Sequence, residues 1–200
     1  MKNRGPRNRN LISATDTILI IIECPPDEDA ADRAEPDAEY ADTVLRLVNT
    51  AKTFSIPVIV VAPGAEREAG AAPHAAIVEA IGEANFIECL SLNPWDTDSF
   101  RERLRQVGRS RLIVAGLSSE ISVSFVVLSA LGEGYDVYVV KDASVGASQE
   151  HHETAIKRMV QAGAVPVTSR QIIFEWQREP PNTSEPLEAQ PPNKKKQKRP

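Results

Sequence analysis

The chain has 200 residues, of which 42% are hydrophobic, and it carries a formal net charge of -5 at pH 7. This is enough apolar material for one substantial core, and usual domain sizes argue against a second domain. No apolar run approaches the roughly 18 to 20 residues that a membrane span requires, and the basic N-terminus lacks the apolar centre of a secretion signal. We therefore expect one cytoplasmic domain that does not enter a membrane.

Basic residues gather at the two ends of the chain. Residues 1–10 contain four basic residues and residues 191–200 contain five, with no acidic residue in either segment. Since the whole chain has a net charge of -5, the part between these segments has a net charge of -14. An acidic body repels phosphate backbones, so contact with an anionic partner would have to involve the ends. Prolines are frequent and apolar side chains scarce near the C-terminus. We expect disordered tails at 1–11 and 179–200, which serve mainly solubility, around a domain at 12–178.

Apolar runs alternate with helical patterns between these ends. Thr17–Ile22 is a β-branched run that is apolar on both faces, as a central parallel strand is. The breaker cluster at 24–29 follows it, apolar residues at helical spacing over 44–51 predict a helix, and 57–62 predicts a second strand. The later predicted elements are a helix at 99–107, a strand at 111–117, a helix at 120–132, a strand at 135–141, a helix at 150–162 and a strand at 165–168.

This alternation predicts an α/β fold. Strands separated by helices of ten or more residues form right-handed crossover units, and these make a doubly wound parallel sheet in a three-layer α/β/α arrangement. Ligands bind such folds beyond the carboxyl ends of the strands. The candidate positions are therefore Glu23 after the first strand, the turn at 118–122 after the strand at 111–117, and the loops between those strands.

Three stretches carry a family resemblance. They are AGLSSEISV at 115–123, ALGEGYDVYVVKDAS at 130–144 and RMVQAGAVPVT at 158–168. Over roughly residues 12–178 the chain resembles the isochorismatase-like cysteine hydrolases, which include nicotinamidases, carbamoylsarcosine amidase and several bacterial hydrolases of uncertain substrate. Three motifs in order make a chance match improbable. The resemblance implies a Rossmann-like fold with a six-stranded parallel sheet and frequent assembly into homo-oligomers.

The resemblance also implies a catalytic triad. The family uses an aspartate at the end of the first strand, a lysine after a short third strand and a cysteine at the start of the helix after the fourth. The helix N-terminus and the lysine favour the thiolate, while the aspartate handles the proton. Matched residue by residue, these positions fall on Glu23, Glu88 and Ser122, the second placed by a Trp-Asp pair that begins at Trp95. The amides of Ser118 and Ser122 take the place of the oxyanion donors.

Each of the three positions differs from the family pattern in a way that impairs the reaction. Glu23 moves the carboxylate by one methylene, Glu88 reverses a charge, and Ser122 replaces a thiol of pKa about 8.5 with a hydroxyl that needs a strong general base. Two carboxylates also disfavour an anion beside them. We therefore expect a non-catalytic or repurposed family member, a pseudoenzyme that acts as a binding or scaffold protein.

A second hypothesis keeps the enzyme active. Two carboxylates that face one another share a proton, so Glu23 and Glu88 could supply an acid and a base to Ser122 in a hydrolase of a small amide, ester or vinyl-ether substrate. The ordinary alternatives are solvated carboxylates and a serine hydroxyl that satisfies a free backbone donor at the start of a helix. Either function leaves room for a small-molecule ligand. We expect its pocket to include Cys24, Cys89, Trp95 and Ser119.

The remaining candidate groups point to no cofactor and no metal. Cys24 and Cys89 each follow a substituted position, so a loop shift of one residue would present a thiol as a nucleophile or a metal ligand. Alternation and the lack of a ligand-spaced cluster favour buried, free thiols instead. His74 is not part of the Asp-x-His-His metal motif of nicotinamidases. Neither His151 nor His152 suggests a ligand set, because adjacent helix residues do not face one ligand.

Two further features have alternatives that the sequence leaves open. Family members often have a cis peptide bond before the oxyanion donor, which here would join Leu117 to Ser118. Apolar residues on the predicted helix at 120–132 fit either a core or an interface between subunits.

Overall fold

A parallel sheet forms the centre of the computed structural model, which describes residues 11–23, 38–63, 75–82, 86–89 and 91–178. Six strands are ordered β3-β2-β1-β4-β5-β6, and every neighbouring pair is parallel. The strands are β1 (Thr17–Ile22), β2 (Val58–Pro63), β3 (Phe86–Cys89), β4 (Arg111–Leu117), β5 (Asp136–Val145) and β6 (Val165–Val167). The predicted α/β class and six-stranded parallel sheet are confirmed, and the strand order reverses between β1 and β4.

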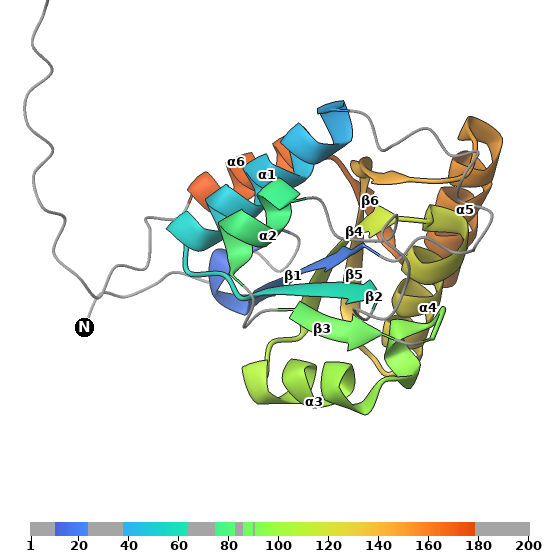
Figure 1. Ribbon diagram of the computed structural model, residues 1–200, viewed down its shortest axis with the longest axis horizontal. Coiled ribbons are helices and arrows are strands. Elements are labelled where there is room, and N and C mark those ends of the chain that lie inside the picture. Colours follow the sequence, from blue (N-terminus) through green and yellow to red (C-terminus); the bar gives the residue numbers. More distant parts are fainter. Residues whose placement is uncertain (1–10, 24–37, 64–74, 83–85, 90, 179–200) are drawn as a thin grey trace, which may run out of the picture.

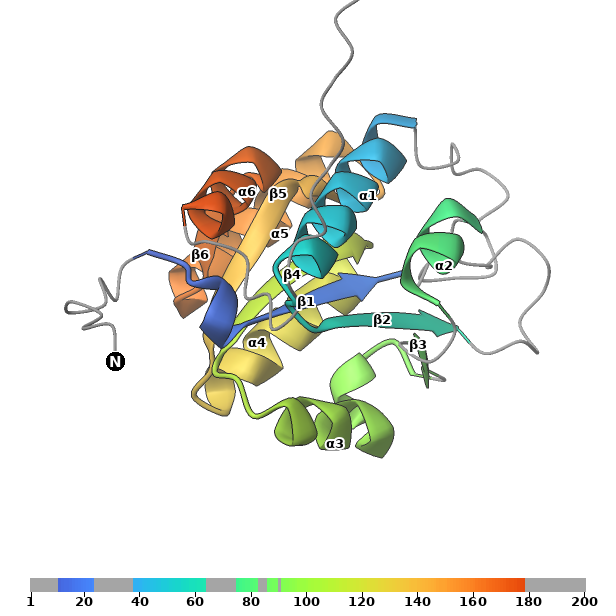
Figure 2. The same cartoon turned by 90° about the vertical axis from the view of Figure 1, so that its left-hand side faces the viewer.

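Helices cover both faces of this sheet. They are α1 (Ala38–Thr53), α2 (Ala75–Ile81), α3 (Asp98–Val107), α4 (Ser124–Gly132), α5 (Gln149–Ala162) and α6 (Ser169–Gln177). The ribbon views show α1, α2 and α6 on one face and α3, α4 and α5 on the other, which gives the three layers (Figures 1 and 2). None of the helices described has both the length and the apolar character needed to cross a membrane.

The central strand β1 supplies both halves of the core. Leu19 and Ile21 pack in one apolar cluster with residues of α1, α2 and α6. Ile18, Ile20 and Ile22 pack in a second cluster with residues of α3, α4 and α5. All five side chains are fully buried, and burial of each one contributes roughly 1.5 to 3 kcal/mol. This explains why the run is apolar at every position rather than at alternate ones.

The apolar surface of α4 belongs to the core. Val123, Val126, Val127 and Ala130 are fully buried in the second cluster, packed among residues of β1, β4 and β5. They are therefore not available as a subunit interface. The predicted helix at 120–132 is divided in the structure, since a π-helical segment at Ser119–Val123 precedes α4.

The strand β5 extends further than the sequence pattern predicts. Its register against β4 shifts between Val114 and Gly116, so that Gly116 pairs with Ser144. Extra residues of β5 are accommodated at this irregularity, and the strand continues to Val145. The result is a long strand whose carboxyl end lies beside the end of β4.

Close backbone packing at the carboxyl ends of β1 and β4 depends on Gly116. Its φ is +140°, and a Cβ atom built there would lie 2.2 Å from the carbonyl oxygen of Ile22 and 2.6 Å from its nitrogen. The two residues are register partners. Only glycine permits both this backbone conformation and this approach. Because Gly116 has no side chain, Glu23, which follows Ile22, can lie close to the turn after β4.

We expect Gly116→Ala to lower the free energy of unfolding by about 3 kcal/mol or more, because the added methyl overlaps backbone that cannot move aside. The matched control is Gly132→Ala at the end of α4, where an added Cβ meets nothing within 4 Å. That change should leave stability unchanged or raise it by about 0.5 kcal/mol. Urea unfolding of both variants measures the difference. Equal stability of the two variants would contradict this account of the β1–β4 contact.

Candidate functional site

Glu23 is a buried carboxylate held by α1. It directly follows β1 and is 3% exposed. The hydroxyl of Tyr40, which is itself buried, donates a hydrogen bond to Glu23 Oε1 at 2.5 Å. Burial, and then the charge of Glu23, raise the pKa of Tyr40 well above its ordinary value, so the phenol stays protonated and remains a donor. The amide of Glu23 donates to the Val61 carbonyl at 2.8 Å, which anchors the backbone as well.

Glu88 lies at the same height along the strands as Glu23, but two strands away. It pairs in register with Ala62 of β2, and Ala62 follows the Ile22–Val61 pair that precedes Glu23. Two strand spacings separate the Glu23 and Glu88 backbones by about 9.6 Å. The Glu88 side chain is exposed, whereas Glu23 is buried. The two carboxylates therefore lie at the same end of the sheet, where the strands end, but one is buried and the other is exposed.

The turn after β4 uses left-handed backbone. Ser118 has φ 58° and ψ 59°, and the Leu117–Ser118 bond is trans, so the expected cis peptide bond is not present. The left-handed residue redirects the chain from strand to helix. The Ser118 carbonyl then accepts from the amides of Ile121 at 3.0 Å and Val123 at 3.3 Å. The second bond spans five residues, as in a π-helix. That the Ser118 and Ser122 amides serve as oxyanion donors stays a prediction.

Ser122 lies inside this π-helical segment. It is 0% exposed, and within the described residues its Oγ has no hydrogen-bond partner. Its hydroxyl therefore does not cap a backbone donor, as a serine at a helix start commonly does. Nearby Ser124 instead donates to the Ser119 carbonyl at 2.7 Å. A serine nucleophile requires an adjacent base, and no described residue supplies one to Ser122 by hydrogen bonding.

Ser119 belongs to a separate chain of polar contacts that the sequence did not indicate. Its Oγ lies 3.1 Å from His152 Nδ1 and donates to Glu120 Oε2 at 3.4 Å. Glu120 Oε1 accepts from the Ala147 amide at 2.9 Å. A hydroxyl has one proton, so when Ser119 donates to Glu120 it accepts from Nδ1–H of His152. In that case a neutral His152 carries its proton on Nδ1.

Burial supports the neutral form of His152. Partial burial, and then the charge of Lys141, lower the pKa of His152 below its ordinary value. The loop after β5 packs tightly against these polar side chains. A Cβ at Gly146 would lie 2.8 Å from Glu120 Oε2 and 2.9 Å from Ser119 Oγ. Ser119 is therefore sealed from solvent, and it is 0% exposed. Its hydroxyl contacts His152, and a role of Ser119 in a ligand pocket stays a prediction.

Trp95 lies in the core. Its ring makes edge contacts with Phe100 and Tyr135, and its Nε1 donates to Glu133 at 2.6 Å. Glu133 follows the C-terminal end of α4, whereas Ser122 precedes the N-terminal end. The indole nitrogen therefore contacts the C-terminal end of α4, and a role of Trp95 in a ligand pocket stays a prediction.

The other predicted site residues are placed only in part. Cys89 ends β3, while Cys24, His74 and the two basic ends lie outside the described residues. Among described residues, no group of three His, Cys, Asp or Glu side chains could hold a metal ion. The structure thus brings Glu23 beside the turn that carries Ser118 and Ser122, because Ile22 and Gly116 are register partners. Tyr40 was missed as the partner of Glu23, although it precedes Val44 and Val48 at helical spacing.

Comparison with known proteins supports the resemblance. The family model of the isochorismatase domain matches residues 17–171. The probable hydrolase YcaC of Escherichia coli is 33% identical over 159 residues, which are 76% of this chain and 73% of that protein. The structure of Pseudomonas aeruginosa YcaC with hexane-2,5-diol and covalent acrylamide superposes with a TM-score of 0.76 at 27% identity, covering 86% of this chain and 85% of that one. The E. coli YcaC structure, an octameric hydrolase of unknown specificity, gives a TM-score of 0.76 at 27% identity over 87% and 85%.

We expect Tyr40→Phe to lower the free energy of unfolding by about 1 to 2 kcal/mol, because a buried carboxylate loses a donor. Tyr138→Phe is the matched control, since Tyr138 is 9% exposed and its hydroxyl makes no hydrogen bond with any described residue. That control should change stability by less than about 0.5 kcal/mol. Thermal and urea unfolding at pH 7 measure both. A Tyr40→Phe variant as stable as the control would mean that the Tyr40–Glu23 bond does not hold the carboxylate.

Proposed function

Because the chain belongs to the isochorismatase family, we propose that it is a member without cysteine-dependent hydrolysis, which acts as a binding or scaffold protein. Glu23, Glu88 and Ser122 stand at the family's triad positions in this proposal. The observation that carries it is the environment of the Ser122 hydroxyl. This hydroxyl is fully buried and has no hydrogen-bond partner within the described part of the chain. Among the described residues, no base contacts this hydroxyl to accept its proton.

The charges around the site support the same conclusion. A cysteine hydrolase stabilises its thiolate with a nearby cation. In this chain the carboxyl ends of β1 and β3 carry two carboxylates, Glu23 and Glu88. The position that differs in sign from the family pattern is Glu88, where a carboxylate replaces a cation. This change of sign opposes formation of an anionic nucleophile at Ser122. The helix N-terminus at Ser122 favours an anion by only about 1 kcal/mol.

An active serine hydrolase remains the competing function. It would need Ser122 to reach a carboxylate that acts as its base. One oxygen of Glu23 is already engaged by the Tyr40 hydroxyl at 2.5 Å, and Glu88 is exposed on the edge strand β3. Both observations favour the non-catalytic function. A small-molecule ligand of the inherited site, and contact of the basic ends with an anionic partner, are further parts of the proposal.

Homo-oligomeric assembly is also part of the proposal. The E. coli YcaC structure is that of an octamer. In this chain, three large apolar side chains are exposed on α5, β6 and α6, with exposed fractions of 39% for Val160, 45% for Val165 and 59% for Phe174. Exposed apolar side chains near a sheet edge are a common feature of subunit contacts. The relative and these residues together support an oligomer.

The loss of catalysis predicts that a thiol alone is not enough to restore reactivity. In Ser122→Cys the introduced thiol should react with iodoacetamide slowly at pH 7, because carboxylates disfavour the thiolate. Adding Glu88→Lys and Glu23→Asp should raise the rate at least about tenfold, since the cation favours the thiolate. Peptide mass spectrometry separates this thiol from Cys24 and Cys89. Glu88→Gln with Ser122→Cys is the control that removes charge without adding a cation, and its rate should be intermediate.

A Ser122→Cys variant that reacts as fast as the triple variant would contradict the proposal. It would mean that the site still favours an anion without the lysine. Circular dichroism of each variant confirms that the fold is retained, so that the rates compare equivalent proteins.

Assembly predicts a native mass several times the 21.9 kDa of one chain. Light scattering during size-exclusion chromatography at micromolar concentration measures this mass. Phe174→Glu should reduce it if α6 lies at a subunit contact, and Gln177→Glu on the same helix is the control for added charge. A monomer at all concentrations up to about 100 µM would contradict the proposed assembly.

A further inference from the structure

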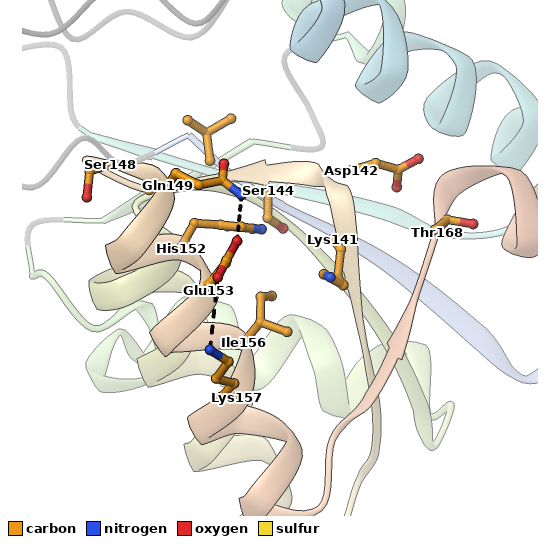
Figure 3. A pocket seen from close by; sticks show the side chains of 12 residues that line it. Lys141, Asp142, Ser144, Ser148, Gln149, His152, Glu153, Ile156, Lys157 and Thr168 are labelled. Atoms are coloured by element: carbon orange, nitrogen blue, oxygen red, sulfur yellow. Dashed lines mark hydrogen bonds and ion pairs between the residues drawn. The ribbon is translucent and has the colours of Figure 1, made fainter.

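A cavity lies beside β5 and α5. It has a volume of about 710 Å³ and is lined by residues of β5, of the loop after it, of α5 and of the start of α6. Glu23, Glu88 and Ser122 are not among its lining residues. The close-up shows His152 and Ile156 of α5 on one side of this cavity and Lys141 of β5 on the other (Figure 3). The cavity therefore presents its own set of chemical groups.

His152 offers a defined acceptor to this cavity. Its Nδ1 lies 3.1 Å from the buried Ser119 hydroxyl, and that hydroxyl donates onward to Glu120. With the proton on Nδ1, the lone pair is on Nε2. Nε2 has no hydrogen-bond partner among the described residues. A base whose ring is oriented by a second group is the usual arrangement for a histidine that contacts a ligand.

Lys141 provides a positive charge that no described residue neutralises by contact. Its ammonium makes no ion pair or hydrogen bond within the described residues. The two carboxylates that line the cavity make their hydrogen bonds and close ion pairs with residues other than Lys141. Asp142 accepts from the amide and hydroxyl of Ser169 at 2.7 Å each. Glu153 accepts from Gln149 at 2.9 Å and pairs with Lys157 at 3.9 Å.

The chemistry of these groups selects a ligand. A free ammonium favours a carboxylate, and a neutral Nε2 accepts a hydrogen bond from a hydroxyl. A ligand ammonium beside Lys141 is disfavoured because the two groups carry the same charge. Val145 and Ile156 line the same cavity and give apolar surface for a short carbon chain.

We propose that this cavity binds a small hydroxycarboxylic acid, whose carboxylate contacts Lys141 and whose hydroxyl donates to His152 Nε2. The site is independent of the proposed loss of catalysis at Ser122. It gives the chain a binding function whether or not the inherited site is active.

Titration of the His152 imidazole by NMR tests the proposal with defined probes. Lactate, 3-hydroxybutyrate and malate are compared with propionate, butyrate and succinate, which lack only the hydroxyl. At least one hydroxy acid should shift the His152 resonances saturably and bind at least tenfold more tightly than its matched acid. Lys141→Gln should weaken that binding at least tenfold. Arg158→Gln, which removes a charge from the exposed face of α5, should not change it.

Variants at the histidine separate ligand contact from general electrostatics. His152→Gln should remove the preference for the hydroxy acid while weak carboxylate binding through Lys141 remains. Ser122→Ala should change neither affinity, which distinguishes this site from the inherited one. If His152→Gln lowers the unfolding temperature, Lys141→Gln still tests the proposal, because Lys141 is exposed.

Three results would each overturn the proposal. The first is the absence of any saturable shift of His152 up to about 50 mM of the hydroxy acids. The second is equal affinity for the acids with and without the hydroxyl. The third is equal weakening by Lys141→Gln and Arg158→Gln, which would mean that only the overall charge of α5 and its surroundings matters.

Discussion

The site depends on the close approach of β1 and β4 at their carboxyl ends. Gly116 has no side chain where a Cβ would lie 2.2 Å from the Ile22 carbonyl oxygen, and this lets the two strands end side by side. Glu23 follows one strand, and the turn at Ser118 follows the other. The left-handed conformation of Ser118 then starts the π-helical segment directly beyond the sheet. Sheet geometry therefore places a carboxylate beside a serine-rich turn before any side-chain contact is considered.

We propose that the geometry that serves catalysis in the family holds a non-catalytic site here. What differs is the chemistry of the side chains that the fold positions. Tyr40 donates to a buried Glu23, and the hydroxyl of Ser122 is buried without a described partner. The unsatisfied hydroxyl costs about 1 to 3 kcal/mol. Such a cost is tolerable in a fold with two large apolar clusters around β1. The stability of the fold is therefore compatible with the proposed loss of catalysis.

The sequence pattern predicted the central part of the fold well. Thr17–Ile22 and Arg111–Leu117 were both assigned correctly as strands, because continuous apolar runs are typical of strands buried on both faces. The helix α6 was not assigned, although the Thr168–Gln171 capping box precedes Ile172 and Trp176 at helical spacing. The extension of β5 to Val145 depends on a register irregularity against β4. Pairing between strands of this kind cannot be read from local sequence.

The contacts of the site were harder to predict than its positions. The resemblance placed Glu23 and Ser122 at neighbouring strand ends, and the sheet brings those ends together. The bond from Tyr40 joins residues 17 apart in sequence, and the contact between Ser119 and His152 joins residues 33 apart. Such contacts depend on tertiary packing, which one sequence does not specify. The edge contacts of Trp95 with Phe100 and Tyr135 are likewise set by tertiary packing.

The central claim is that the fold no longer activates a nucleophile at Ser122. The most direct measurement is labelling of the unmodified protein with a fluorophosphonate, followed by peptide mass spectrometry that reports modification of each serine. The account predicts that Ser122 is labelled no more than the equally buried Ser124. Stoichiometric labelling of Ser122 in the folded protein, abolished by prior denaturation, would contradict it.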